Sequence, residues 1–350
     1  MNANPGAKGT KADDLKRFVL RALAQGREGF AASRAQDRVT VTLGAQAFQF
    51  AESEDFLKSS LRQCLVSPPT ATDPVADIAI YADYSGWHLA HQTAALFAPH
   101  QGTPQPDTFL AENGVRAIYN AERNSWDIFD SKNRFGVRLQ PGTEATTVWE
   151  MSAPLTYFCK WIAELDHKTM VHAASLTIGG VGALLVGYGG AGKSGTVLGA
   201  LACGFQSAGD DYTLISAKDG YRAHAIYRSI KQDVAGLDRV GLPRPGELNW
   251  QNKAVFRPET LLPSAIVDTA PIHVLIAPRL GAQRTRFFPI DPLGVFKTLA
   301  FSTIYQHAVD SAQVFKACAA LVRDVPCYGM ELSNDHTEVS AELAKFLRQL

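Results

Sequence analysis

The segment Gly187-Tyr-Gly-Gly-Ala-Gly-Lys-Ser194 decides the expected fold, because it fits the G-x-x-x-x-G-K-S pattern of a phosphate-binding loop, or P-loop. The apolar run Ala183-Leu-Leu-Val186 precedes it, as expected for a buried strand, and a helical pattern that ends near Gly204 follows it. In this order of strand, loop and helix, backbone N–H groups and the helix N-terminus hold phosphate oxygens. The alternative is a glycine-rich turn without a ligand, and the complete motif in this context favours the nucleotide site.

The side chains of the motif have separate expected roles. Lys193 would neutralise the β- and γ-phosphates of ATP, and the Ser194 hydroxyl would bind Mg²⁺. The residues predicted to bind the nucleotide are Gly187, Gly189, Gly190, Ala191, Gly192, Lys193, Ser194 and Gly195.

Length and composition describe a folded protein without a global charge. The chain has 350 residues, 46% of them hydrophobic, and its 34 basic residues balance its 34 acidic ones. A neutral chain offers no extended field for a nucleic acid or an anionic membrane, so we expect neither partner. Five widely spaced cysteines argue against a disulfide framework or a structural zinc site. The N-terminus has no apolar signal region and no run long enough to cross a bilayer, so we expect a cytoplasmic protein.

The sequence predicts two domains. Residues 1–12 are small and polar and read as a flexible tail, and residues 13–148 read as a β-rich α+β domain. A helix from Asp13 opens that domain, and alternating segments such as 38–44 and 114–119 predict antiparallel strands. Residues 149–350 alternate between helices and strands, as an α/β domain does.

Within the second domain, several elements can be placed. Gly179-Gly180 predicts a hairpin between strands 170–178 and 181–186. The other expected elements are a helix over 152–165, strands over 272–276 and 286–290, helices over 292–299 and 312–322, and a strand over 328–332 before a terminal helix.

An acidic pair, Asp210-Asp211, lies on the apolar segment 205–215, which reads as a short strand. Two carboxylates near a triphosphate suggest divided work: one holds Mg²⁺ and the other accepts a proton from an attacking hydroxyl. The pair is also compatible with the start of a turn. The sequence does not say which aspartate is the base and which is the metal ligand.

His172 precedes the hairpin, and on the residues alone it is equally a packed strand-end residue and a catalytic group. The segments 171–194 and 202–211 together resemble the nucleotide-binding core of HPr kinase/phosphorylase and related kinases. That resemblance implies a P-loop domain of the HPr-kinase/PEP-carboxykinase type. It also implies that Asp210 and Asp211 serve as base and metal ligand and that His172 assists at the phosphate.

The resemblance has clear departures. Ala173 and Gly195 replace a glycine and an acidic residue of the HPr kinase pattern, and the later Glu-x-Arg-Gly-x-Gly signature has no counterpart near 227–231. A related kinase fits better than HPr kinase itself, for example the serine kinases that modify lasso peptides.

We therefore expect an ATP- and Mg²⁺-dependent kinase that phosphorylates a serine of a peptide or small protein. The sequence is compatible with a homo-oligomer and leaves the oligomeric state open. The alternatives are a nucleotide-sensing module with weak ATPase activity and a small-molecule kinase. Arg228 and Lys231 follow the turn at 218–220, and a returning strand could bring them near the phosphates, but we favour a place on the solvated surface. Lys253, Arg279, Arg284 and Arg286 have no assigned role, and the i, i+3 pair His88 and His91 lacks a third metal ligand.

Overall fold

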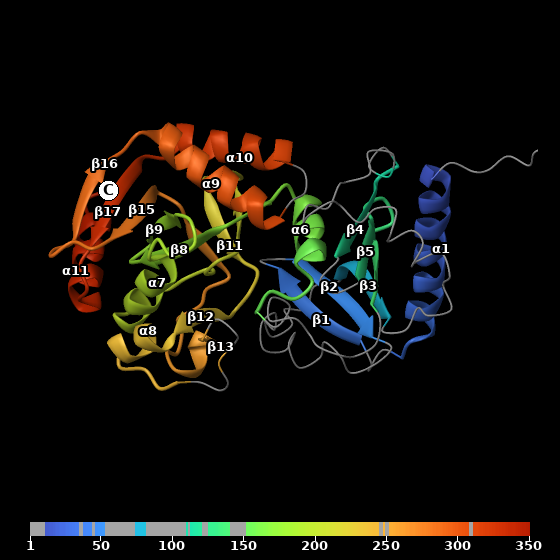
Figure 1. Ribbon diagram of the computed structural model, residues 1–350, viewed down its shortest axis with the longest axis horizontal. Coiled ribbons are helices and arrows are strands. Elements are labelled where there is room, and N and C mark those ends of the chain that lie inside the picture. Colours follow the sequence, from blue (N-terminus) through green and yellow to red (C-terminus); the bar gives the residue numbers. More distant parts are fainter. Residues whose placement is uncertain are drawn as a thin grey trace, which may run out of the picture. The chain divides into compact units, whose positions relative to one another are not determined.

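The computed structural model describes residues 11–34, 38–43, 46–52, 74–81, 110, 113–120, 125–140, 152–244, 248, 252–307 and 311–350. Helices alternate with strands of several sheets in a mixed α/β protein, as predicted (Figure 1). The chain divides into two compact units: one holds residues 1–40, 48–56 and 73–145, and the other holds residues 146–350 with 41–47 and 57–72. Within the described ranges, no helix is long and apolar enough to cross a membrane.

A six-stranded sheet and one long helix make up the described N-terminal elements. The strand order is β1-β2-β3-β6-β5-β4. The elements are α1 (Lys11–Ala32), β1 (Arg38–Leu43), β2 (Gln46–Glu52), β3 (Pro74–Tyr81), β4 (Val115–Asn120), β5 (Ser125–Asp130) and β6 (Phe135–Leu139). The expectation of an antiparallel sheet is wrong at one place, because β3 and β6 pair in parallel. Alternating hydrophobicity marks a strand but not its direction, and the 53 residues between these two strands are enough for a crossover.

The helix α1 packs through the apolar stripe that its sequence predicts. Leu15, Phe18 and Val19 are buried and belong to one core with strand residues such as Ile128. The stripe follows the i, i+3, i+4 spacing of one helical face. The helix begins at Lys11, two residues before the predicted start.

The second unit is built on a five-stranded sheet with the order β16-β17-β15-β9-β8. Strands β9, β15 and β17 are parallel, and β16 and β8 are antiparallel to their neighbours. Helices α7 and α11 pack on one face of this sheet, and α9 and α10 pack on the other. The bounds are β8 (Ala173–Ile178), β9 (Val181–Val186), α7 (Lys193–Ala202), β15 (Val274–Leu280), β16 (Arg286–Pro289), α9 (Pro292–His307), α10 (Ser311–Asp324), β17 (Cys327–Leu332) and α11 (His336–Leu347).

The β8–β9 hairpin forms as predicted. Gly179 and Gly180 both have positive φ angles, 58° and 82°, which is the conformation that a two-residue hairpin turn needs. A Cβ atom on Gly182 in the next strand would meet the carbonyl oxygen of Pro271. The glycine therefore lets the segment before β15 lie against this hairpin.

A four-stranded antiparallel sheet lies next in the unit, with the order β14-β11-β10-β7. Its strands are β7 (Thr169–Val171), β10 (Thr213–Ser216), β11 (Arg222–Ala225) and β14 (Thr269–Pro271). The strands β12 (Ile230–Asp233) and β13 (Lys253–Phe256) form a separate antiparallel ribbon. The remaining elements are α6 (Thr156–Glu164), α8 (Val234–Arg239) and the 3₁₀ turn Pro258–Thr260.

The predicted strand over 170–178 is wrong as a single element. It breaks at His172: β7 pairs with β10 in the four-stranded sheet, and β8 pairs with β9 in the five-stranded sheet. An apolar run carries no signal for a change of sheet, because partner strands are remote in sequence. The predicted helix over 292–299 also continues farther, to His307.

Candidate active site

The glycine loop, residues 187–192, joins β9 to α7 and folds around the Lys193 ammonium. Lys193 Nζ donates hydrogen bonds to the carbonyl oxygens of Gly187 at 2.6 Å and Tyr188 at 3.3 Å, and the residue is only 5% exposed. Burial lowers the pKa of Lys193, although the carboxylates of Asp211 and Asp210 oppose that shift. The loop thus holds a buried cation at the N-terminus of a helix, where anions bind readily.

One glycine of the loop is required by its neighbours as well as by its backbone. Gly192 has a φ of 100°, and a Cβ atom there would lie 2.9 Å from a Leu332 methyl carbon and 3.0 Å from a Leu280 methyl carbon. A side chain at this position would strain the backbone and push these leucines apart. The loop therefore depends on glycine where it passes the ends of β15 and β17.

Ser194 and Asp210 form the first of two polar contacts beside this cation. The Ser194 hydroxyl donates to Asp210 Oδ1 at 3.1 Å. Burial and the neighbouring Asp211 carboxylate raise the pKa of Asp210 to about 6, against weaker opposing effects of the Ser194 hydrogen bond, Lys193 and Lys231. Asp210 is thus a buried carboxyl with too little positive charge around it.

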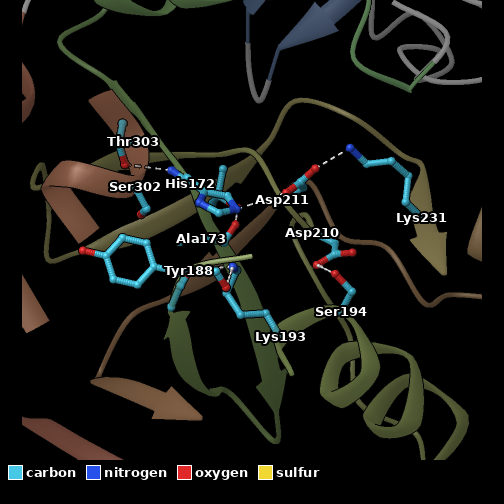
Figure 2. Close-up of polar contacts among 12 residues, drawn as sticks. His172, Ala173, Tyr188, Lys193, Ser194, Asp210, Asp211, Lys231, Ser302 and Thr303 are labelled. Atoms are coloured by element: carbon cyan, nitrogen blue, oxygen red, sulfur yellow. Dashed lines mark hydrogen bonds and ion pairs between the residues drawn. The ribbon is translucent and has the colours of Figure 1, made fainter. Parts of the chain in front are cut away.

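Asp211 has the opposite environment (Figure 2). His172 Nε2 lies 3.2 Å from its Oδ1 atom, and Lys231 Nζ lies 2.5 Å from its Oδ2 atom. Burial acts to raise the pKa of Asp211, but Lys231 and the His172 hydrogen bond overcome it and hold that pKa well below the usual range. Two adjacent carboxyl groups therefore have pKa values displaced in opposite directions, which is typical of sites that assign them different tasks.

The predicted strand over 205–215 is wrong where the acidic pair lies, since β10 begins at Thr213. Asp211 has a φ of 76° and Gly209 a φ of 148°, so the chain turns sharply on both sides of Asp210. A left-handed backbone at an aspartate is uncommon and ends an extended run. This turn gives the two carboxylates their separate partners.

Strand register explains how His172 reaches Asp211. The antiparallel pair β7–β10 places Val171 opposite Thr213, so His172, the residue that follows β7, lies beside the acidic turn. The His172 N–H donates to Thr303 Oγ1 of α9 at 2.9 Å, and the Thr213 hydroxyl donates to the carbonyl oxygen of Ala173 at 2.9 Å. These bonds fix the backbone at the point where the chain crosses between sheets.

A pocket of about 440 Å³ brings most of the predicted residues together. Its lining includes His172, Gly189, Gly190, Gly192, Lys193, Ser194, Gly195 and Asp211. Gly187, Ala191 and Asp210 are not part of the lining. Asp210 is reached through Ser194, to which it is bonded. The volume is within the range of about 300–1,000 Å³ typical of small-molecule sites.

The lining also contains residues that the sequence did not single out, and it corrects others. Lys231 lies in the pocket on β12, so its expected place on the solvated surface is wrong. Arg228 is mostly buried as well, but it pairs with Glu259 at 2.8 Å and Asp268 at 2.5 Å, outside the lining. The further lining residues are Thr196, Gly199, Gln232, Asp233, Arg239, Lys253, Leu280, Leu332, Ser333, Asn334, His336 and Val339.

The sequence contains a signal for some of these additional lining residues. The segment Ser333 to His336 follows a parallel strand, and ligands in α/β sheets bind at the carboxyl ends of such strands. The turn at 218–220 allowed a strand that returns with Lys231 toward the phosphates, but nothing in the sequence identifies Asp211 as the partner of this lysine. Arg279, Arg284 and Arg286 are exposed and outside the lining, and Arg286 pairs with Glu331 at 2.8 Å. His88 and His91 lie outside the described residues.

The oxygens of Ser194 and Asp210 suit a magnesium ion, which needs few protein ligands, better than they suit a metal whose ligands all come from the protein. In the part of the chain that the structure describes, no three His, Cys, Asp or Glu side chains gather into a metal site. Mg²⁺ uses one or two protein oxygens and takes its other ligands from water and substrate phosphates. Asp210 also has the raised pKa of a carboxyl that an added cation would relieve. Both carboxylate oxygens of Asp211 already face His172 and Lys231, so that residue fits a metal less well.

Comparisons with known proteins find similarity among solved structures. No family model and no curated protein matches the sequence. A solved structure, the Hpr(Ser) kinase/phosphatase from Coxiella burnetii, is similar over 52% of this chain and 99% of its own, with 13% identity and a TM-score of 0.29. A similarity of this size does not by itself assign a family or a reaction.

Proposed function

We propose that this protein is an ATP-dependent serine kinase with an HPr-kinase/PEP-carboxykinase-like P-loop domain. It transfers the γ-phosphoryl group of Mg-ATP to a hydroxyl, which we take to be a serine of a peptide or small protein. The observation that carries the proposal is the meeting of Lys193, the Ser194–Asp210 pair and the His172–Asp211–Lys231 cluster at one pocket. Phosphoryl transfer needs this combination of cations that bind the phosphates, a pair of metal ligands, and a carboxylate that accepts the proton of the acceptor hydroxyl.

The nucleotide end of the site uses the groups around the glycine loop. Backbone N–H groups of the loop and Lys193 would hold the β- and γ-phosphates, and Ser194 with Asp210 would hold the metal. Bound Mg²⁺ would supply charge neutralisation at the β- and γ-phosphate oxygens. Lys193 exchanges its bonds to the carbonyls of Gly187 and Tyr188 for bonds to phosphate oxygens. A buried lysine makes this exchange with little reorganisation because it is already positioned.

The acceptor end uses Asp211. The acceptor oxygen forms a bond to the γ-phosphorus, the bond between that phosphorus and the bridging oxygen breaks, and ADP leaves with the bond electrons. The hydroxyl proton passes to the Asp211 carboxylate. His172 keeps that carboxylate oriented through its 3.2 Å contact.

Lys231 links the two ends. It lines the pocket and contacts Asp211, so it can turn toward a γ-phosphate that enters. When that contact loosens, the pKa of Asp211 rises, because the lysine is the largest of the effects that hold it down. The base therefore gains strength when the nucleotide is bound.

The test is transfer of label from γ-³²P-ATP to peptides and proteins of the host lysate, followed by identification of the labelled product. We expect phosphoserine, and we expect Asp211→Asn to abolish its formation while ATP still binds. Asp219→Asn, the same change in an exposed turn outside the pocket, is the matched control. Label confined to a metabolite would indicate a small-molecule kinase. Release of inorganic phosphate alone would indicate a nucleotide-sensing module with ATPase activity.

A further inference from the structure

The pocket continues past the phosphate position along helix α7. Gly195, Thr196 and Gly199 all line it, and they lie on one face of that helix. Lys193 and Ser194 occupy the first turn, where the β- and γ-phosphates are expected. A nucleotide anchored there must place its sugar and base elsewhere in the same pocket.

The two sides of the pocket differ in charge. Helix α7 contacts β12 on one side and α11 on the other (Figure 1). The β12 side contributes the cations Lys231, Arg239 and Lys253 together with one carboxylate, Asp233, so its charged groups are mainly positive. The α11 side contributes the apolar side chains of Leu332 and Val339 together with Ser333, Asn334 and His336, none of which is an acidic or permanently cationic residue. The cationic side suits phosphates, and the α11 side suits a flat, uncharged ring.

The α11 side is also closely packed and well supported. A Cβ atom on Gly199 would lie 2.9 Å from His336 Cβ, so this glycine lets α11 lie directly against α7. Glu338 accepts hydrogen bonds from the Ser333 hydroxyl at 2.7 Å and from the Thr285 N–H at 2.9 Å. Asp335 caps α11 by accepting from the N–H groups of its first turn. The loop before α11 is therefore held in place before any ligand arrives.

A buried hydroxyl on the α7 side points to a ligand as well. Thr196 is 6% exposed and lines the pocket, and its Oγ1 atom has no hydrogen-bond partner among the described residues. Buried hydroxyls are normally satisfied, so an unsatisfied one at a pocket wall is explained by a ligand group that is not part of the chain.

We infer that the ribose and base of the nucleotide bind in a nucleoside cradle formed by Thr196, Gly199, Leu332, His336 and Val339. This inference rests on the proposed function, which places the triphosphate at Lys193. The base lies between the His336 ring and the apolar side chains, since bases stack on aromatic rings without regard to sequence. The Thr196 hydroxyl bonds a polar atom of the sugar.

The test compares the affinity of each variant for Mg-ATP with its affinity for Mg-tripolyphosphate, which has the phosphates but no nucleoside. We expect His336→Ala to weaken ATP binding about tenfold and to leave tripolyphosphate binding unchanged, as loss of one stacking contact would. Thr196→Val should weaken ATP binding in the same selective way. Lys345→Ala, an exposed change farther along α11, should alter neither affinity.

The controls distinguish a failure of the phosphate site from a failure of the nucleoside cradle. Lys193→Ala should weaken both ligands, and if it weakens neither, the phosphate site and this inference both fail. If Lys193→Ala behaves as expected but His336→Ala and Thr196→Val leave the ratio of the two affinities unchanged, the cradle is refuted and the kinase proposal stands. Photocrosslinking with 8-azido-ATP gives a second readout: we expect adducts within residues 332–339, and adducts within residues 231–253 would refute the cradle.

Discussion

Replacing Asp210 by asparagine is expected to stabilise the ligand-free protein at neutral pH. The folded protein raises the pKa of this carboxyl from 3.8 to about 6, mainly by burial and by repulsion from Asp211. An acid whose pKa is raised on folding holds its proton more tightly in the folded state, so stability falls as the pH rises from about 4 to about 6. Above that window the full cost of ionising Asp210 is present, and Asn, which is neutral, removes it.

The size of the gain follows from the shift. About two pKa units correspond to about 3 kcal/mol, which we reduce to about 2–3 kcal/mol because the Ser194 hydrogen bond to Asn is weaker than its bond to a carboxylate. For a unit of about 200 residues this is a rise in Tm of about 5–10 °C. The assay is the Tm of wild type and Asp210→Asn between pH 4 and pH 8, without Mg²⁺ or nucleotide.

The same substitution one residue later provides the control. The pKa of Asp211 is held low in the folded state, so this residue contributes stability above the unfolded pKa of about 4 that is lost as the pH falls. Asp211→Asn should therefore lower the Tm at pH 8, since Lys231 and His172 lose their partner. Opposite pKa shifts of the two carboxyl groups are refuted if both variants shift the Tm in the same direction, or if the gain of Asp210→Asn is as large at pH 4 as at pH 8.

The other predictions concern the ligand, the reverse reaction and the fold. Lys193→Ala should lower ATP affinity about tenfold or more through loss of a charge-assisted contact, and an unchanged titration of the folded variant would contradict the phosphate site. The protein should not dephosphorylate the product of the proposed reaction with inorganic phosphate, because the signature associated with the reverse reaction is absent from the sequence between Tyr227 and Arg286; stoichiometric pyrophosphate release would show otherwise. Gly182→Ala should lower the Tm of the protein markedly, since the added Cβ meets the Pro271 carbonyl oxygen, whereas Gly195→Ala has open space and should not.

The sequence predicted best what depends on neighbours in the chain. The β8–β9 hairpin and the helix after the glycine loop formed where Gly179-Gly180 and Gly192-Lys193-Ser194 placed them. Turn glycines and helix starts act over a few residues, so their signals are local. The mixed α/β class followed from the same local patterns.

Features that depend on partners far along the chain escaped prediction. The break at His172 exists because β7 and β8 pair with different strands, and Lys231 reaches the site because a 20-residue excursion returns beside Asp211. The residues give no signal for the break, and for Lys231 they allow a returning strand without showing where it ends. The acidic pair was compatible with both a strand and a turn, and the sequence could not choose between them because the partners of Asp211, His172 and Lys231, are remote in sequence.

The crossing at His172 has a consequence for how this protein can change. The glycine loop and α7 follow a strand of the five-stranded sheet, whereas Asp211 precedes β10 of the four-stranded sheet and Lys231 lies in the separate β12–β13 ribbon. Insertions and substitutions in the latter two sheets can therefore change the surroundings of Asp211 and Lys231 without altering the strand that carries the glycine loop. His172 lies where the chain passes from one sheet to the other, so a library of variants around Asp211 and Lys231 should keep His172 unchanged and substitute the residues on either side of it.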